Sequence, residues 1–463
     1  MLQTPLFTNF LKLSEPLTFI AIALLISCFF IIHLLEKKKK SFSIRMFVGL
    51  VLGIALGFVI QVFAQFPDTT TIESTPWIQE TITWYGLFGS AFVAFIQMLV
   101  FPIIMISLIQ VILSLKNDFN ISSLVKRTLF WLMLTTGIAT LIGVFLSMVT
   151  NLGSNIMILD QTTRNSREVI TLVQVFLNLI PSNPIKAMND NNVIAIVIFA
   201  SLVGSSAHIM RSKEKYKRVL DLFADLIDAL YRIVMSMAMT IVKFMPYGVI
   251  ALMSNTLISN GTTAIQQAFL FIILIYTACF LMMIVYAIIL IFHGLNPLTF
   301  FKKSSPALLM ALSSRSSVGS LPMTISTLEN ELGVNTGTAN FVSSLGSTMG
   351  MNGCAGYFPG MIAIMVAIMT NTPIDMSFIF MVLIIAVLGS LGIAGIPGSA
   401  TMAASIMLAG IGMSEYFPLL AIVLAIDPLI DMARTMSNVN GAMISAVCID
   451  KELGTLNIEK YNS

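Results

Sequence analysis

The chain carries a succession of apolar runs, most of them at least about 20 residues long, which is the length that a helix needs to cross a bilayer. The strands of a membrane barrel need only about 10 residues and alternate apolar with polar positions, so a barrel does not fit. Composition agrees, because 57% of the residues are hydrophobic and only 10% are charged. A water-soluble protein of this size needs a more polar surface. We therefore predict an all-α membrane protein with many spans. Between the first run and residue 303 we expect these spans at 41–65, 84–115, 129–150, 169–210 (interrupted at 178–192), 220–254 and 268–292.

Clusters of basic residues predict the orientation in the membrane, because lysine and arginine near span ends mark the cytoplasmic side. Four lysines at 37–40 follow the first apolar run at 17–35, segment 211–218 reads RSKEKYKR, and two more lysines stand at 302–303. These clusters fall in every second connection between the predicted spans, and the loop at 66–83 is acidic. We expect the N-terminus to lie outside the cell and the C-terminus to lie in the cytoplasm.

Beyond residue 303 the apolar segments are broken by glycine, proline and serine. The breaks read SSRSSVGSLPMT at 313–324, GSTMGMNG at 346–353 and GIAGIPGS at 392–399. Broken apolar segments at membrane depth are typical of re-entrant hairpins and discontinuous helices around a binding site. Loops at the membrane surface would require additional spans that the segment lengths do not supply. We predict two hairpins on either side of a broken helix.

One apolar segment, at 417–448, carries ionisable and polar side chains on what should be one helix face. They are Asp427, Asp431, Arg434, Thr435 and Asn438. From the first of them the offsets are about 4, 7, 8 and 11, which helical periodicity places on one side. Ionisable groups at membrane depth are costly and usually face a polar cavity or pathway. An aspartate–arginine pair that only locks two helices is the alternative, but the neighbouring threonine and asparagine favour a solute site.

The chemistry of the predicted site fits a zwitterion that has an additional acid group. Serine hydroxyls and backbone N–H groups at Ser316, Ser317 and the second tip, 395–398, suit a carboxylate. Asp431 suits an ammonium group, and the planar fork of Arg434 suits a second carboxylate. We expect a small zwitterionic amino acid as the solute and the lipid bilayer as the surroundings.

Other functions are disfavoured by the same sequence. The net charge of +3 is too small to indicate a nucleic-acid partner, and the four cysteines and three histidines show no metal-binding spacing. HExxH, GxSxG and Walker motifs are missing from the sequence, so we expect neither an enzyme nor an ATP-driven pump, and no cofactor or metal. An ion channel would need a continuous polar path rather than one cluster.

Five motifs resemble the dicarboxylate/amino acid:cation symporter family, which has the glutamate-transporter fold. They are SSRSSVGSLP at 313–322, GSTMGMNG at 346–353, GIAGIPG at 392–398, DMARTMSNVNG at 431–441 and NLIPSNP at 178–184. The resemblance covers about 41–448 and leaves the first apolar run as an extra N-terminal span. It implies eight family helices, two re-entrant hairpins, a homotrimer and elevator-type alternating access.

The resemblance also implies a division of the chain. The expected parts are 1–40 (extra helix and basic loop), 41–295 (mainly scaffold and trimerisation), 296–450 (transport domain) and 451–463 (cytoplasmic tail). The third and sixth family helices, at about 125–150 and 265–295, would join the transport domain. By position, the substrate residues would be Ser316, Ser317, Cys354, Gly395, Gly398, Asp431, Arg434, Thr435 and Asn438. Asp431 would hold the amino group, Arg434 the distal acid, and Ser317 with Asn438 the main carboxylate.

The expected coupling ion is Na⁺ or H⁺. Asn352 stands where the family has an ion-binding aspartate, and Ala442 stands where sodium-coupled members often have another. Hard cations prefer anionic oxygen. The remaining candidates for a cation are the oxygens of Gly346, Thr348, Asn352, Asn438, Thr135 and Thr136. A proton would instead be carried by Asp427 or Asp431.

The substrate class follows from one further departure. Cys354 replaces a threonine of the acidic amino acid carriers, and small residues follow it. With the altered ion motif, the chain is most similar to the bacterial L-cystine importers of the family. We therefore expect a secondary active importer of L-cystine. Uptake of glutamate, aspartate or C4-dicarboxylates is the alternative, and an anion channel is a third.

Overall fold

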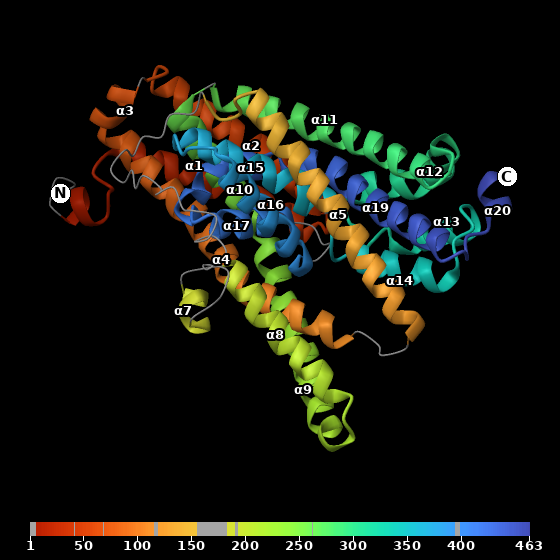
Figure 1. Ribbon diagram of the computed structural model, residues 1–463. Coiled ribbons are helices and arrows are strands. Elements are labelled where there is room, and N and C mark those ends of the chain that lie inside the picture. The colour runs from red at the N-terminus through yellow and green to blue at the C-terminus, as the bar shows by residue number, and fades with distance from the viewer. Residues whose placement is uncertain are drawn as a thin grey trace.

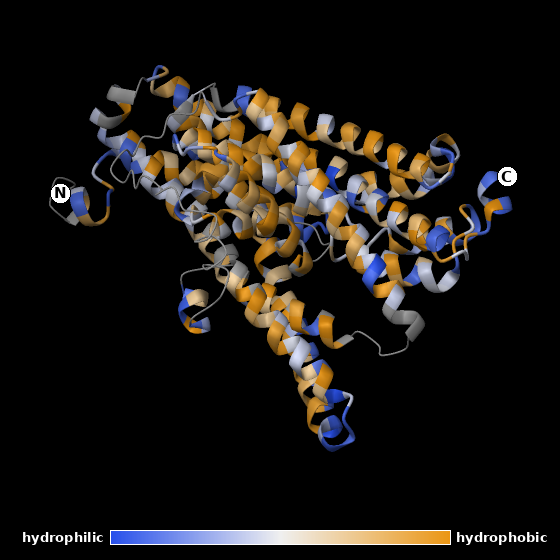
Figure 2. Cartoon of the chain, viewed as in Figure 1, coloured by the Kyte–Doolittle hydropathy of each residue, from blue (hydrophilic) through white to orange (hydrophobic). Residues whose placement is uncertain are grey.

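The computed structural model describes residues 6–40, 42–67, 69–114, 119–154, 183–189, 193–261, 263–393 and 399–463. These ranges contain helices, turns and loops but no strand (Figure 1). Five of their helices are long and apolar enough to cross a membrane, or six if one bent pair counts as a single span. The prediction of an all-α, multi-pass membrane protein is confirmed. In Figure 2 the outward helices are mostly hydrophobic, while hydrophilic residues gather at the free end of α9 and near the C-terminus.

The N-terminal part of the chain contains the predicted extra helix. This helix, α1 (Pro16–Lys37), ends at the lysine cluster and is followed by α2 (Phe42–Phe63). A short helix α3 (Thr69–Ser74) precedes α4 (Pro76–Ser114), which begins well before the apolar run predicted to start at 84. Helix α1 packs against α2, α4 and α10, so it belongs to the folded body of the protein.

A buried carboxylate attaches α1 to α4. Glu80 on α4 is only 3% exposed, and it accepts hydrogen bonds from the Ser14 N–H at 2.8 Å and the Ser14 hydroxyl at 2.5 Å. It also accepts from the Thr18 hydroxyl at 2.5 Å. Glu80 therefore holds both the residues just before α1 and, through Thr18, its first turn against α4. No sequence pattern indicated this contact, because its partners are 62 to 66 residues apart.

Replacing Glu80 with alanine is expected to destabilise the protein by about 2–4 kcal/mol, because several hydrogen bonds to a charged, buried acceptor are lost together. Thermal unfolding in detergent should show a lower midpoint. Hydrogen exchange should accelerate in the first turns of α1. The exposed Thr83, whose hydroxyl bonds only within α4, provides the control Thr83→Ala. If Glu80→Ala and Thr83→Ala behave alike, the carboxylate does not attach α1.

The middle of the chain departs from the prediction in one place. The segment 220–254, expected as one span, forms α9 (Glu214–Lys243) and α10 (Met245–Asn260), which meet at an angle of 48°. Pro246 is the second residue of α10, and a proline there cannot continue the hydrogen bonds of the helix before it. Because α9 begins at Glu214, most of the basic segment 211–218 is helical rather than loop.

The remaining helices of this region agree with the predicted breaks. They are α5 (Phe119–Val149), α7 (Pro184–Asn189), α8 (Val193–Arg211) and α11 (Thr263–Phe292). Helices α5 and α11 begin earlier than the expected 129 and 268. Within the interruption predicted at 178–192, the described residues 183–189 contain only the short helix α7, and residues 169–182 and 190–192 lie outside the described residues. Helices α8 and α9 extend together away from the other helices (Figure 1).

The C-terminal part contains three broken elements in the predicted order. Helices α12 (Pro297–Ser314) and α13 (Leu321–Asn330) form the first helix–turn–helix unit. The broken helix consists of α14 (Thr336–Gly346), the π-helical turn η2 (Asn352–Tyr357) and α15 (Phe358–Met369). The second unit consists of α16 (Met376–Gly389), the turn η3 (Ser390–Gly392) and α17 (Ser399–Gly410), and its tip at 394–398 lies outside the described residues.

Glycines allow the broken helix to lie against its neighbours. Gly350 has φ of +60°, a left-handed conformation that favours glycine, and a Cβ there would lie 2.5 Å from the Cβ of Leu132 on α5. A Cβ on Gly353 would collide with the backbone of Arg434. The break therefore contacts α5 on one side and the polar helix on the other.

The polar segment predicted as one helix over 417–448 is divided. A 3₁₀ segment η4 (Ser414–Leu420) and a short helix α18 (Ala421–Ala425) precede the polar helix α19 (Asp427–Glu452). Pro428 lies in the first turn of α19, where its missing N–H costs nothing. Asp427 is therefore the first residue of a buried helix rather than a residue in the middle of one. Helix α19 packs against α5, α11, α12, α14 and η2.

The segment after α19, expected as a tail, is packed onto the base of the first helix–turn–helix unit. In the last turn of α19 itself, Asp450 is fully buried and accepts hydrogen bonds from the Asn335 N–H at 2.8 Å and the Thr338 hydroxyl at 2.9 Å. Helix α20 (Ile458–Asn462) places the Tyr461 hydroxyl 2.9 Å from the carbonyl of Asn296, to which it donates. This end of the chain thus joins the bases of α12 and α14.

Candidate functional site

The five polar residues predicted on one helix face lie buried along the first half of α19. Arg434 is 0% exposed, and Asp427 and Asp431 are each 5% exposed. Thr435 and Asn438 are buried as well. A buried charge is stable only when it is paired or hydrogen-bonded, so the contacts of these residues decide what the face can do.

Arg434 is held by two carboxylates and an aromatic ring. Its Nη2 lies 2.5 Å from Asp427 Oδ1 and 3.1 Å from Asp431 Oδ1, and it donates to both. The guanidinium carbon lies 4.4 Å from the centroid of the Phe358 ring, at the start of α15. A cation over a desolvated aromatic face is stabilised by about 2 kcal/mol. The charged corner is therefore shared by α19 and the broken helix.

Two guanidinium nitrogens of Arg434 remain without a partner. Nε and Nη1 are buried and make no hydrogen bond within the described part of the chain. An unsatisfied buried donor costs about 1–3 kcal/mol, and more for a charged group, so native structures rarely retain one without a function. Arg434 can therefore accept a further anionic ligand, and a carboxylate has the matching geometry.

Asn438 connects α19 to the broken helix. Its Oδ1 accepts hydrogen bonds from the N–H groups of Gly353 at 2.8 Å and Cys354 at 3.2 Å, and its Nδ2 donates to the Cys354 sulfur at 3.2 Å. These bonds satisfy backbone donors that the helix break leaves free. The predicted contact of Asn438 with a substrate carboxylate would have to use its second amide proton.

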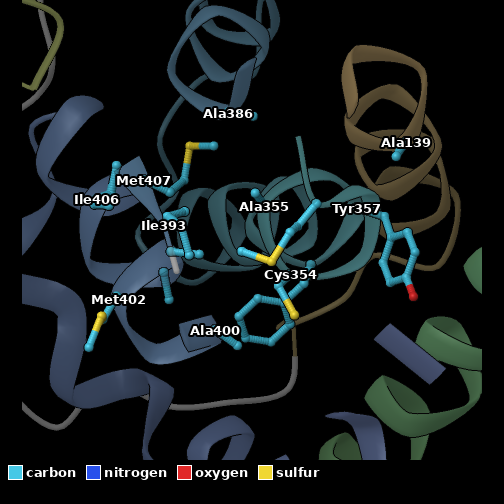
Figure 3. Close-up of a cluster of buried hydrophobic side chains, with 14 of the residues drawn as sticks. Ala139, Cys354, Ala355, Tyr357, Ala386, Ile393, Ala400, Met402, Ile406 and Met407 are labelled. Atoms are coloured by element: carbon cyan, nitrogen blue, oxygen red, sulfur yellow. The ribbon is translucent and has the colours of Figure 1, made fainter. Parts of the chain in front are cut away.

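Cys354 lies at the buried junction of the broken helix and the second helix–turn–helix unit. Its side chain and Ala355 gather with Ile393, Ala400 and Met407 (Figure 3). All of these side chains are buried. The predicted residues Gly395 and Gly398 fall within the undescribed tip of this unit.

The tip of the first unit reaches the start of α19. Arg315, in a left-handed conformation with φ of +53°, donates from Nη1 to the Pro428 carbonyl at 3.1 Å. Ser317 is buried, and the Ser316 hydroxyl accepts from the Gly319 N–H at 2.9 Å. The Arg315 contact joins this tip to the start of α19, and within the described residues neither Ser316 nor Ser317 makes a hydrogen bond to the polar side chains of α19. Sequence reasoning missed Arg315, although an arginine inside an apolar segment is itself a signal.

A second buried polar cluster surrounds Asn352. Its Oδ1 lies 3.1 Å from the hydroxyls of both Thr135 and Thr136 on α5. Its Nδ2 donates at 2.6 Å to the Tyr286 hydroxyl on α11, which donates in turn to the Ser437 carbonyl at 3.1 Å. The sequence did not point to Tyr286, because one tyrosine in an apolar helix is unremarkable.

The Asn352 cluster is neutral. The Thr136 hydroxyl also lies 2.7 Å from the Leu132 carbonyl of its own helix, and the Thr135 hydroxyl lies 2.9 Å from the Trp131 carbonyl. Each hydroxyl has one proton to donate. Of the other cation candidates, Gly346 packs against Ala442, and the Thr348 hydroxyl contacts the Leu345 carbonyl at 3.1 Å. The oxygens of the cluster supply polarity without a negative charge.

Comparison with known proteins defines the class to which this fold and site belong. Residues 42–452 match the Sodium:dicarboxylate symporter family, and the chain belongs to that family. It is therefore a cation-coupled symporter and not an enzyme, as the sequence motifs predicted.

Individual relatives within the family carry names that specify a substrate. The chain is 34% identical to the L-cystine uptake protein TcyP of Bacillus anthracis over 446 residues, which cover 93% of this chain and 94% of that protein. It is 34% identical over 462 residues to L-cystine uptake protein TcyP of Shouchella clausii, with 96% of both chains covered. The corresponding protein of Bacillus licheniformis is also 34% identical, over 448 residues.

Proposed function

We propose that this protein is an importer of L-cystine in the bacterial plasma membrane. The observation that carries the proposal is the buried Asp431–Arg434 pair, whose guanidinium retains two unpartnered nitrogens. A site with one carboxylate and one arginine with spare donors matches a ligand that has both an ammonium and a carboxylate group. Cystine has one of each at both ends. The names of the relatives at 34% identity support the same substrate.

Binding would exchange the partners of an existing ion pair. Without substrate, Asp427 and Asp431 both neutralise Arg434. When cystine enters, its ammonium group would pair with Asp431, and its distal carboxylate would accept hydrogen bonds from the free nitrogens of Arg434. Asp427 would keep the hydrogen bond that it accepts from Nη2 of Arg434. Each buried charge thereby keeps an opposite charge nearby, which limits the desolvation cost of binding.

Other substrates fit the same corner less well. A C4-dicarboxylate has no ammonium group for Asp431, and two carboxylates would compete with Asp427 for one guanidinium. Glutamate and aspartate satisfy both charges, but the thiol of Cys354 replaces a hydroxyl that could donate strongly to them. We therefore propose cystine first and acidic amino acids second.

Transport would proceed by an elevator mechanism in which 296–450 moves as one domain. Helices α5 and α11 pack against α19, so they would move with it, whereas α1, α2, α4 and α10 pack together and would form the scaffold. The units α12–α13 and α16–α17 would act as re-entrant hairpins, with the second as the outer gate. The basic clusters would place the bases of α12 and α13 in the cytoplasm.

The scaffold would assemble as a homotrimer. The outward face of α9 exposes Leu222, Leu226 and Ile233. Asp225 and Arg232 are exposed on the same helix. Arg232 already pairs with Asp228 on its own helix, whereas the exposed Asp225 would be costly against lipid and would find an opposite charge in a second copy of the chain. Glutaraldehyde, which can join several lysines of each copy, should yield crosslinked oligomers up to trimers, and a protein that remains monomeric would refute this part.

We propose the proton as the coupling ion. Asn352 provides no negative charge for Na⁺, and its amide donates to Tyr286. Asp427 is a buried carboxylate beside Arg434 that the substrate would not need. It could therefore take up and release a proton during each cycle.

Asp427→Asn should separate binding from coupling. The amide oxygen can still accept from Arg434, so equilibrium binding of L-cystine should change by less than about tenfold. Accumulation driven by an inward proton gradient should be lost, because the amide cannot titrate. The control is Asp221→Asn, which removes a carboxylate on α9 that pairs with Arg211 away from the charged corner of α19. Undiminished accumulation by Asp427→Asn would exclude Asp427 as the carrier.

The substrate and the ion can be tested together in proteoliposomes. Uptake of labelled cystine, glutamate and succinate is measured with sodium and pH gradients imposed separately. We expect cystine to be accumulated most, and the pH gradient to drive it. Preferential uptake of succinate would overturn the substrate assignment, and a strict requirement for sodium would overturn the ion.

A further inference from the structure

A cleft of about 620 Å³ opens at the base of the first helix–turn–helix unit, away from the charged corner of α19. It lies between α12, α13 and the end of the chain. The residues that matter for its chemistry are Lys302, Lys303, Pro306, Met323, Ser326 and Glu331. The proposed transport cycle uses none of them.

The floor of the cleft carries both signs of charge. Lys303 is fixed, because its Nζ donates to the carbonyls of Glu331 at 3.1 Å and Lys460 at 2.6 Å. The Lys302 ammonium and the Glu331 carboxylate have no hydrogen-bond or ion-pair partner in the described part of the chain. The hydroxyl of Ser326 adds a donor on the α13 side. This floor suits a ligand with a phosphate and an ammonium group.

The cleft becomes apolar toward the tip of the unit. Pro306 lies one turn beyond Lys302 on α12, and Met310 lies one turn further. Met323 on α13 lines the same cleft, and the side chains of Met310 and Met323 are 40% and 41% exposed. Lys302 and Lys303 mark this end as the cytoplasmic membrane surface. A headgroup on the floor would therefore have its acyl chain directed into the hydrocarbon layer.

We propose that this cleft binds a phospholipid of the phosphatidylethanolamine class from the cytoplasmic leaflet. Its phosphate lies on Lys302 with support from Lys303, and its ammonium lies on Glu331. One acyl chain follows Pro306, Met310 and Met323. A basic pocket between spanning helices on the cytoplasmic side is a known mode of recognising the phosphate of anionic headgroups. The opposite charges of the floor select a zwitterionic headgroup over a purely anionic one.

Native mass spectrometry of the purified full-length protein tests the proposal with defined lipids. The wild-type protein should retain phosphatidylethanolamine more tightly than phosphatidylglycerol. Lys302→Gln should weaken both lipids by about tenfold, the effect of losing one charge-assisted contact. Glu331→Gln should weaken only phosphatidylethanolamine and remove the preference. Lys37→Gln, an exposed lysine at the same predicted membrane surface, should change nothing.

Each alternative result overturns the proposal. Equal binding of the two lipids by the wild-type protein excludes recognition of the ammonium group. Unchanged binding in Lys302→Gln excludes the cleft. If inorganic phosphate at millimolar concentration displaces the lipid completely, the site is one for free phosphate. Thermal unfolding of each variant ensures that a loss of binding is not a loss of fold, and neither side chain has a partner whose loss should destabilise the protein.

Discussion

Arg434→Ala is expected to reduce L-cystine uptake at least about 100-fold, because the substrate loses its distal carboxylate partner and a charge-assisted pair of bonds. Asp427 and Asp431 would also be left as buried carboxylates without their cation. Arg434→Lys should fail as well, since a point charge cannot lie over Phe358 and serve three acceptors at once. Uptake by proteoliposomes and equilibrium binding of labelled cystine are the measurements.

The loss of uptake in Arg434→Ala must be distinguished from misfolding, because removing one partner of a buried ion pair costs about 3–5 kcal/mol of folding stability. The double variant Asp427→Asn with Arg434→Gln removes one charge of each sign and leaves only Asp431 without its cation, so it should be less destabilised than Arg434→Ala. Size-exclusion profiles and thermal unfolding verify this. If the double variant is folded and binds cystine as tightly as the wild type, Arg434 has only a structural role.

Asp431→Asn should cost about 100-fold in affinity for cystine, because the ammonium group loses a buried counter-charge. Arg434 retains Asp427, so the fold should persist. A substrate without an ammonium group, such as succinate, should lose nothing. Binding isotherms for both ligands give the comparison.

The matched control for this substitution lies on the same helix. Asp450 is a fully buried aspartate near the other end of α19, where it binds Asn335 and Thr338. Asp450→Asn should lower stability without changing the selectivity between cystine and succinate. Equal losses for cystine and succinate in Asp431→Asn would contradict its role as the ammonium partner.

Much of the fold could be predicted because its physical cause is local. Twenty apolar residues indicate a span wherever they occur, and the glycine and proline breaks after residue 303 correspond to the turns between α12 and α13 and between α14 and α15. The family and its transport class were also predictable, because residues 42–452 contain its motifs.

The errors have local causes too. The bend between α9 and α10 and the division of 417–448 both occur near a proline, Pro246 and Pro428, that the hydropathy of the surrounding run concealed. Mean hydropathy does not distinguish a continuous helix from two helices that meet end to end. Attention to proline positions would have predicted both.

The contacts of the site were beyond sequence reasoning because they join distant segments. Helical spacing placed Asp427, Asp431 and Arg434 on one face. It could not show that Arg434 pairs with both aspartates. Nor could it show that Asn352 meets Tyr286, a residue 66 positions away, or that Asn438 holds the helix break. Such pairings depend on how helices pack, and one sequence contains no record of that packing.

The most direct test of the central claim is a structure of the protein with L-cystine bound. We predict the ammonium group of one end within about 3.2 Å of Asp431 and a carboxylate at a similar distance from Nη1 or Nε of Arg434. The contact between Asp431 and Arg434 should be lengthened or lost. Cystine bound elsewhere, with both aspartates still on Arg434, would contradict the claim that this charged corner receives the substrate.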